Sequence, residues 1–115
     1  MRNFQTNIME NRVKLLDLLT RLKLEGNSIA GFGAPAKATT LLHYFGIGND
    51  LLDYIVDDSP LKQGRYIPGK RIPIISSFSN PDYIFILAWN FADSIMERYP
   101  QYKGRFILPF PPRIV

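Results

Sequence analysis

The sequence has no cysteine and only one histidine and one tryptophan among its 115 residues. The lack of cysteine excludes disulfide scaffolds, cysteine-ligated zinc sites and thiol nucleophiles. The single His43 excludes a multi-histidine metal site, so we expect no metal in this chain. Long apolar runs are missing too, since none reaches the roughly 18 residues of a membrane span. No signal-peptide pattern opens the chain, which predicts a cytoplasmic protein without a membrane partner.

The net charge of the chain is small, whereas its hydrophobic content is high enough for a folded core. The net charge is +4, from 14 Lys and Arg against 10 Asp and Glu. These basic residues are scattered, which argues against a nucleic-acid partner but suits phosphate-bearing small molecules. Hydrophobic residues make up 46% of the chain. That content excludes a mostly disordered chain and predicts one folded domain over residues 1–115.

Helical and strand patterns alternate along the chain. Leucines recur at helical spacing over residues 4–25, and Gly26 with Asn27 is a typical helix end. This leading segment, residues 1–26, is predicted to be a connector helix. Further helices are predicted from Pro35 to Gly46 or Gly48 and over 91–102. Strands are predicted at 28–32, 52–56, 72–75, 83–88 and 106–108.

This alternation predicts an α/β domain with a mostly parallel sheet of about five strands. A loop is expected over residues 59–70. The tail from Pro109 to Pro112 is expected not to pair with a strand, because proline lacks the N–H that a ladder needs.

One glycine-rich turn lies between a predicted strand and a predicted helix, with the sequence Gly31-Phe-Gly-Ala-Pro-Ala-Lys37. It nearly matches G-x-G-x-x-G/A, in which glycines allow a tight turn and close approach of a ligand. The N–H groups of the following helix attract phosphate. The candidate contacts are Gly31, Gly33, Ala34 and Lys37. In the alternative interpretation the glycines only make a turn and Lys37 is solvated.

Three more candidate groups follow strands or occupy the long loop. Asp57 ends the second strand and either accepts ribose hydroxyls or caps a turn. The basic and aromatic loop from Lys62 to Arg71 either covers an anionic ligand or is a solvated surface loop; its candidates are Lys62, Gln63 and Tyr66. Trp89 and Asn90 follow the most apolar strand, where α/β sheets bind ligands. Asn90 is alternatively a helix N-cap. No residue stands out as catalytic, and His43 is interpreted as a packing residue.

Taken in order, these motifs resemble one family. They comprise Gly31-Phe-Gly-Ala-Pro-Ala-Lys-Ala-Thr-Thr-Leu-Leu, Asp53-Tyr-Ile-Val-Asp-Asp-Ser-Pro-Leu-Lys-Gln-Gly-Arg-Tyr-Ile-Pro-Gly, Ile72-Pro-Ile and Ala88-Trp-Asn-Phe-Ala-Asp. The chain looks like the C-terminal domain of the S-adenosylmethionine-dependent C-methyltransferases that act on nucleotide-linked deoxysugars. The resemblance implies a Rossmann-like, three-layer domain.

The resemblance also implies which domain of the enzyme holds each ligand. In such enzymes zinc lies in an N-terminal domain, and S-adenosylmethionine and the catalytic base lie in a central domain. The nucleotide sugar lies between the central and C-terminal domains. We therefore expect this domain to hold neither cofactor, to contact the nucleotide sugar and the central domain, and to be inactive alone.

Two other classes stay open. One is a small NAD- or nucleotide-binding Rossmann unit that uses Gly31, Gly33 and Asp57. The other is a purely structural domain that packs against its neighbours and binds no ligand.

Overall fold

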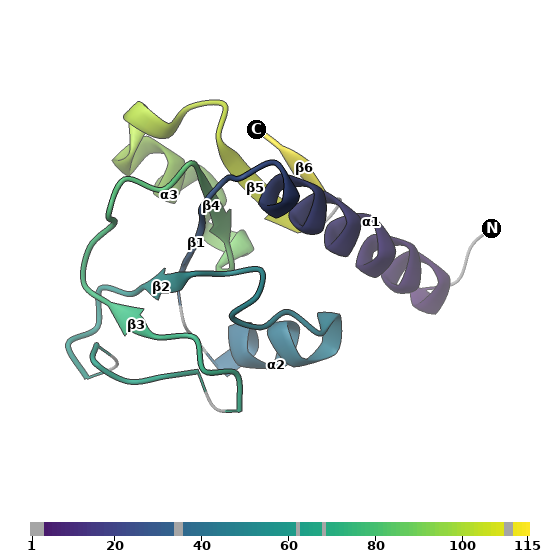
Figure 1. The fold of residues 1–115 in the computed structure, drawn as a ribbon, viewed down its shortest axis with the longest axis horizontal. Coiled ribbons are helices and arrows are strands. Elements are labelled where there is room, and N and C mark those ends of the chain that lie inside the picture. Colours follow the sequence, from purple (N-terminus) through teal and green to yellow (C-terminus); the bar gives the residue numbers. More distant parts are fainter. Residues whose placement is uncertain (1–3, 34–35, 62, 68, 110–111) are drawn as a thin grey trace.

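A single sheet of six strands forms the centre of the computed structural model, which describes residues 4–33, 36–61, 63–67, 69–109 and 112–115 (Figure 1). The strands are β1 (Ile29–Phe32), β2 (Tyr54–Val56), β3 (Ile74–Ile75), β4 (Tyr83–Ile86), β5 (Phe106–Pro109) and β6 (Pro112–Ile114). Their order is β3-β2-β1-β4-β5-β6. All neighbours pair in parallel except β5 and β6, which are antiparallel. The α/β class and the mostly parallel sheet are thereby confirmed, with six strands rather than about five.

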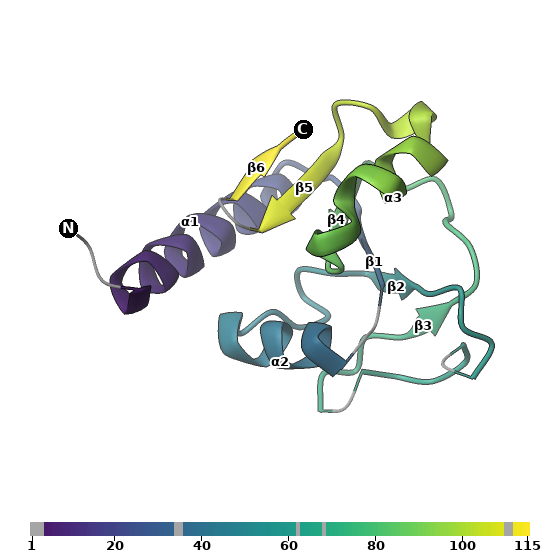
Figure 2. The same cartoon turned by 180° about the vertical axis from the view of Figure 1, so that it is seen from behind.

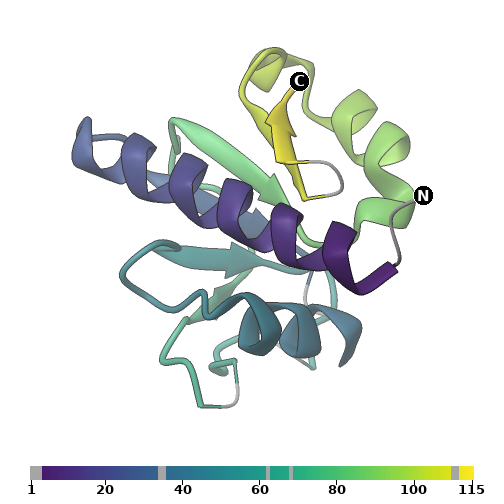
Figure 3. The same ribbon diagram turned by 90° about the vertical axis from the view of Figure 1, so that its right-hand side faces the viewer.

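Helices cover both faces of this sheet (Figures 1 and 2). They are α1 (Phe4–Leu24), α2 (Ala36–Phe45) and α3 (Ala92–Arg98), with short 3-10 helices η1 (Trp89–Phe91) and η2 (Pro100–Tyr102). Figure 3 shows α1 and α2 lying together in front of the sheet, whereas α3 packs on the other face. None of the helices in the described part of the chain is long and apolar enough to span a membrane.

Strand alternation divides the core into two clusters. Ile55, Phe85 and Ile107 point toward α1 and α2 and are completely buried with the leucines of those helices. Their neighbours Val56 and Ile84 point the opposite way, toward α3 and η2. A sheet buried on both faces explains why residues 83–86 carry no charge.

The C-terminal half of α1 is part of the core. Leu15, Leu19 and Leu22 are buried against the sheet, whereas Met9 and Val13 are exposed. The N-terminal turns of α1 extend beyond the sheet (Figure 1). The predicted helix end is confirmed, since Gly26 has φ +90° and the Asn27 N–H donates to the Leu22 carbonyl at 3.1 Å. The connector role of this helix stays a prediction.

The single helix predicted over residues 91–102 was wrong, because the segment is broken in two. The first part, α3, ends at Arg98, and η2 begins at Pro100. Proline has no N–H to donate and disfavours helical dihedrals in the residue before it. Tyr99 accordingly leaves the helical region, with φ −130° and ψ 61°.

The expectation that the tail could not pair was also wrong. Pro109 and Pro112 lie opposite each other where β5 meets β6. The hydrogen bonds come from their neighbours: the Val115 N–H donates to the Phe106 carbonyl at 2.8 Å, and the Gly104 N–H donates to the Val115 carbonyl at 3.1 Å. Proline is tolerated here because β6 is an edge strand that Pro112 opens.

Candidate functional site

The candidate site lies at the carboxyl edge of the parallel strands, where the strand order reverses between β1 and β4. The connection that leaves β1 runs toward β2 on one side, whereas the connection that leaves β4 runs toward β5 on the other, which opens a crevice between them. Two backbone hydrogen bonds hold its sides together. The Gly33 N–H donates to the Val56 carbonyl at 2.9 Å, and the Leu87 N–H donates to the Phe32 carbonyl at 3.0 Å. The residues that follow β1, β2 and β4 therefore meet at one edge.

The two glycines of the turn are required for different reasons. A Cβ atom on Gly31 would lie 3.0 Å from Ile55 Cγ1 and 3.1 Å from Leu87 Cδ1, so close packing explains this glycine without any ligand. Gly33 has φ +90°, a conformation that L side chains rarely adopt. The structure thus shows both glycines in a tight turn, whereas their contact with phosphate stays a prediction.

Several predicted residues cannot be placed in full. Ala34 and Lys62 lie outside the residues that the structure describes. The backbone of Lys37 belongs to the first turn of α2, but its side chain is outside the described part. The predicted roles of these residues stay predictions.

Asp57 lies at the site and takes part in a turn. It is 9% exposed, and its Oδ1 accepts the Ser59 N–H at 2.7 Å. The Gln63 Nε2 donates to the Asp57 carbonyl at 2.9 Å, so Gln63 lies at the same edge. The turn role of Asp57 is confirmed; ribose binding stays a prediction.

Tyr66 is placed elsewhere. It forms an antiparallel bridge with Pro73, just before the start of β3, and its neighbour Ile67 is buried in the core. The carboxyl edge lies at the other end of β3. The 59–70 segment is therefore anchored by a short hairpin near the amino end of β3. Contact of Tyr66 with a ligand stays a prediction.

Trp89 and Asn90 form η1 directly beyond β4, as the strand prediction placed them. Trp89 is half-buried and packs against the core cluster that faces α1 and α2. Asn90 is exposed. The N-cap interpretation of Asn90 was wrong, because Phe91 occupies that position of α3 and makes no side-chain cap hydrogen bond.

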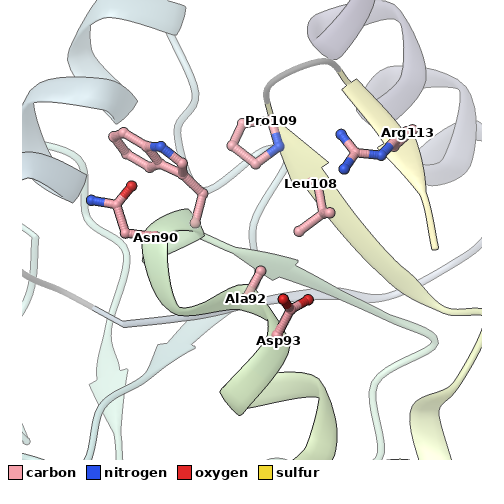
Figure 4. Close-up of a pocket in the computed structure, with 7 residues that line it drawn as sticks. Asn90, Ala92, Asp93, Leu108, Pro109 and Arg113 are labelled. Atoms are coloured by element: carbon pink, nitrogen blue, oxygen red, sulfur yellow. The ribbon is translucent and has the colours of Figure 1, made fainter.

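A pocket of about 220 Å³ adjoins Trp89 (Figure 4). Its other lining residues are Asn90, Ala92, Asp93, Leu108, Pro109 and Arg113. Asp93 and Arg113 were missed by the sequence analysis. The first was counted as part of a helix, and the second follows a tail that was expected not to pair. For Asp93 the usable signal was its position four residues after Trp89, close to a strand end.

An ion pair braces the loop that follows β2. The Arg98 guanidinium donates to both carboxylate oxygens of Asp58, at 2.8 and 3.1 Å. It also lies over the Phe32 and Tyr99 rings, 5.3 and 5.4 Å from their centroids. The hydrogen bonds from Arg98 lower the pKa of the Asp58 carboxyl below its usual value. Arg98 of α3 thereby fixes the position of the Asp58 side chain, beside Asp57.

The lowered pKa of Asp58 predicts a pH-dependent contribution to stability. A carboxyl whose folded pKa is depressed stabilises the fold above its unfolded pKa, and this contribution is lost as pH falls through the folded value. Both side chains are largely exposed, so we expect Asp58→Asn to cost only about 0.5 kcal/mol at neutral pH. Urea unfolding at pH 7 and at roughly pH 2 should show a smaller difference at the lower pH, because the contribution fades as Asp58 becomes protonated. Glu97→Gln, on the exposed side of α3, is the matched control. An equal loss at both pH values would contradict the prediction.

No metal site is evident in the described part of the chain, where no three His, Cys, Asp or Glu side chains are grouped as ligands. The described residues therefore offer no cluster of the ligand types that zinc takes.

Comparison with known proteins gives a consistent result. The family model described as the C-methyltransferase C-terminal domain matches residues 1–111. The C-methyltransferase NovU of Streptomyces niveus is 36% identical over 122 aligned residues, which cover 99% of this chain and 29% of that protein. The chain thus spans less than a third of the length of this relative. On these matches, which extend from α1 to the end of the parallel sheet, the chain belongs to the family of C-methyltransferase C-terminal domains.

Proposed function

We propose that this chain is the Rossmann-like, acceptor-binding domain of a cytoplasmic, S-adenosylmethionine-dependent C-methyltransferase whose substrate is a nucleotide-linked deoxysugar. The observation that carries the proposal is the reversal of strand order between β1 and β4. The order β3-β2-β1-β4-β5 is that of dinucleotide-binding sheets, which bind their ligands at this reversal. The Gly33 turn and Asp57 lie at this edge, and α2 begins beside it.

Each group has a definite part in the proposed complex. The backbone of Gly33 and the start of α2, with Lys37, neutralise the pyrophosphate, since helix N–H groups and a positive side chain favour an anion. Asp57 accepts a ribose hydroxyl. Neither step transfers a methyl group, so the catalytic base and the methyl donor are assigned to another domain. A protein as long as the matched relative has ample room for one, because this chain covers 29% of it.

Zinc and S-adenosylmethionine are assigned to such other domains as well. For zinc the physical reason is that the sequence has no cysteine and only one histidine, and that the described residues hold no cluster of metal ligands. S-Adenosylmethionine supplies an electrophilic methyl group, and the present residues would only hold and orient the acceptor.

Amide-shift NMR on the 115-residue chain tests the proposal. Thymidine diphosphate glucose, S-adenosylmethionine and NAD are added in separate samples. We expect the sugar nucleotide alone to shift the amides of Gly33 and Asp57, and Lys37→Ala to weaken its binding about tenfold, as loss of one charge-assisted phosphate contact would.

Lys103→Ala is the charge-matched control, because Lys103 lies just before the start of β5, at the opposite edge of the sheet. Shifts with NAD instead would favour the dinucleotide-binding alternative. No shifts with any of the three compounds would favour the purely structural one and contradict the proposal.

A further inference from the structure

The pocket beside Trp89 lies on the opposite side of Gly33 from Asp57. In the sheet order Asp57 follows β2, Gly33 follows β1, and the pocket is built at the ends of β4 and β5. Neighbouring strands are ~4.8 Å apart, so the three steps from β2 to β5 span roughly 14 Å. A long ligand whose middle lies at Gly33 would therefore place one end at Asp57 and its other end at the pocket.

Hydrogen-bonding groups of both kinds line the pocket above an apolar floor, with Arg113 as a donor and Asp93 as an acceptor. The Arg113 guanidinium reaches in from β6, and the Asp93 carboxylate rises from the first turn of α3 (Figure 4). The floor is apolar, formed by Leu108, Pro109 and Ala92. The Asn90 amide points away from Arg113 in Figure 4.

This combination distinguishes a hydroxylated ring from a phosphate. A phosphate would accept hydrogen bonds from Arg113 but would be repelled by the Asp93 carboxylate. A hydroxyl group suits both, because it donates to a carboxylate and accepts from a guanidinium. The C–H face of a sugar ring can lie on the apolar floor. The volume of about 220 Å³ suits one six-membered ring and is too small for a whole nucleoside diphosphate sugar.

We propose that this pocket binds the hexose ring of the nucleotide sugar, with Asp93 and Arg113 holding its hydroxyl groups. The inference rests on the proposed function, because it requires the pyrophosphate at Gly33 and the nucleoside toward Asp57. It assigns the sugar-specific contacts to α3 and to the β5–β6 hairpin. Arg113 lies beyond residues 1–111, the part of the chain that the family model matches.

A comparison of two probes tests the inference. Thymidine diphosphate and thymidine diphosphate glucose are titrated against the chain by NMR and calorimetry. Both should shift Gly33 and Asp57, while only the glucose-bearing probe should shift the Trp89 indole and Asp93. Asp93→Asn and Arg113→Ala should each weaken the glucose-bearing probe about tenfold and leave the affinity for thymidine diphosphate within twofold.

Matched controls are available on the same elements. Glu97→Gln changes the same charge one turn further along α3, and Lys103→Ala removes one positive charge at the opposite edge; both should leave the two affinities unchanged. If Arg113→Ala weakened both probes equally, Arg113 would bind phosphate and the inference would be overturned. If both probes bound but neither variant mattered, the inference would fail while the proposed function stood. If neither probe bound, both would fail.

Discussion

Replacing Leu19 by alanine is expected to lower the free energy of unfolding by about 2–5 kcal/mol. Leu19 is fully buried in the cluster that joins α1 to the sheet. Removing three of its carbons leaves a cavity that the rigid sheet beneath it cannot fill. A domain of this size has a total stability of about 5–15 kcal/mol, so this one change removes a large fraction of it.

Val13→Ala on the same helix is the matched control, since Val13 is 68% exposed. Its cost should stay within about 0.5 kcal/mol. Urea unfolding followed by far-UV circular dichroism measures both variants. Equal, small effects would show that α1 is only loosely attached to the domain, as a pure connector would be.

Gly31→Ala is expected to destabilise the domain by about 1–3 kcal/mol through overpacking. The new methyl group would meet Ile55 Cγ1 at 3.0 Å and Leu87 Cδ1 at 3.1 Å. Ile55 and Leu87 are completely buried, so neither can move aside into solvent. The loss arises from packing between β1 and its neighbours, and the fraction that stays folded should still bind a sugar nucleotide through the Gly33 turn.

Gly104→Ala separates crowding from backbone strain. Gly104 has φ +83°, yet nothing lies within 4 Å of an added Cβ atom. Its cost should therefore be strain alone, about 1 kcal/mol. The two variants are compared by thermal and urea unfolding. If Gly31→Ala were as stable as the parent chain, the close packing at β1 would be contradicted.

Some features could be predicted because they are local. The end of α1 at Gly26 follows from a left-handed glycine, and β4 follows from four successive uncharged residues that are buried on both faces. The break at Tyr99 is also local, because Pro100 lies inside the segment that was predicted as one helix. Alternating local patterns of this kind were enough to predict the α/β class and a mostly parallel sheet.

The candidate site was predicted only in part, because local patterns place only some of its residues. Gly33 and Asp57 each follow a strand, and parallel strands bring such residues to one edge. Tyr66 also lies near a strand in sequence, and an antiparallel bridge to Pro73 places its backbone near the amino end of β3. The residues around Tyr66 do not indicate the direction of that pairing.

What the sequence alone determined was therefore most of the local elements, their alternation and the glycine turn, because hydrogen bonding and periodicity within a few residues specify them. Only the tertiary structure decided which distant residues meet. Arg98 pairs with Asp58 across 40 residues, and Arg113 reaches the pocket beside Asp93 because β6 folds back on β5. Such contacts between distant residues depend on the order of strands in the sheet, and the packing of the whole core determines that order.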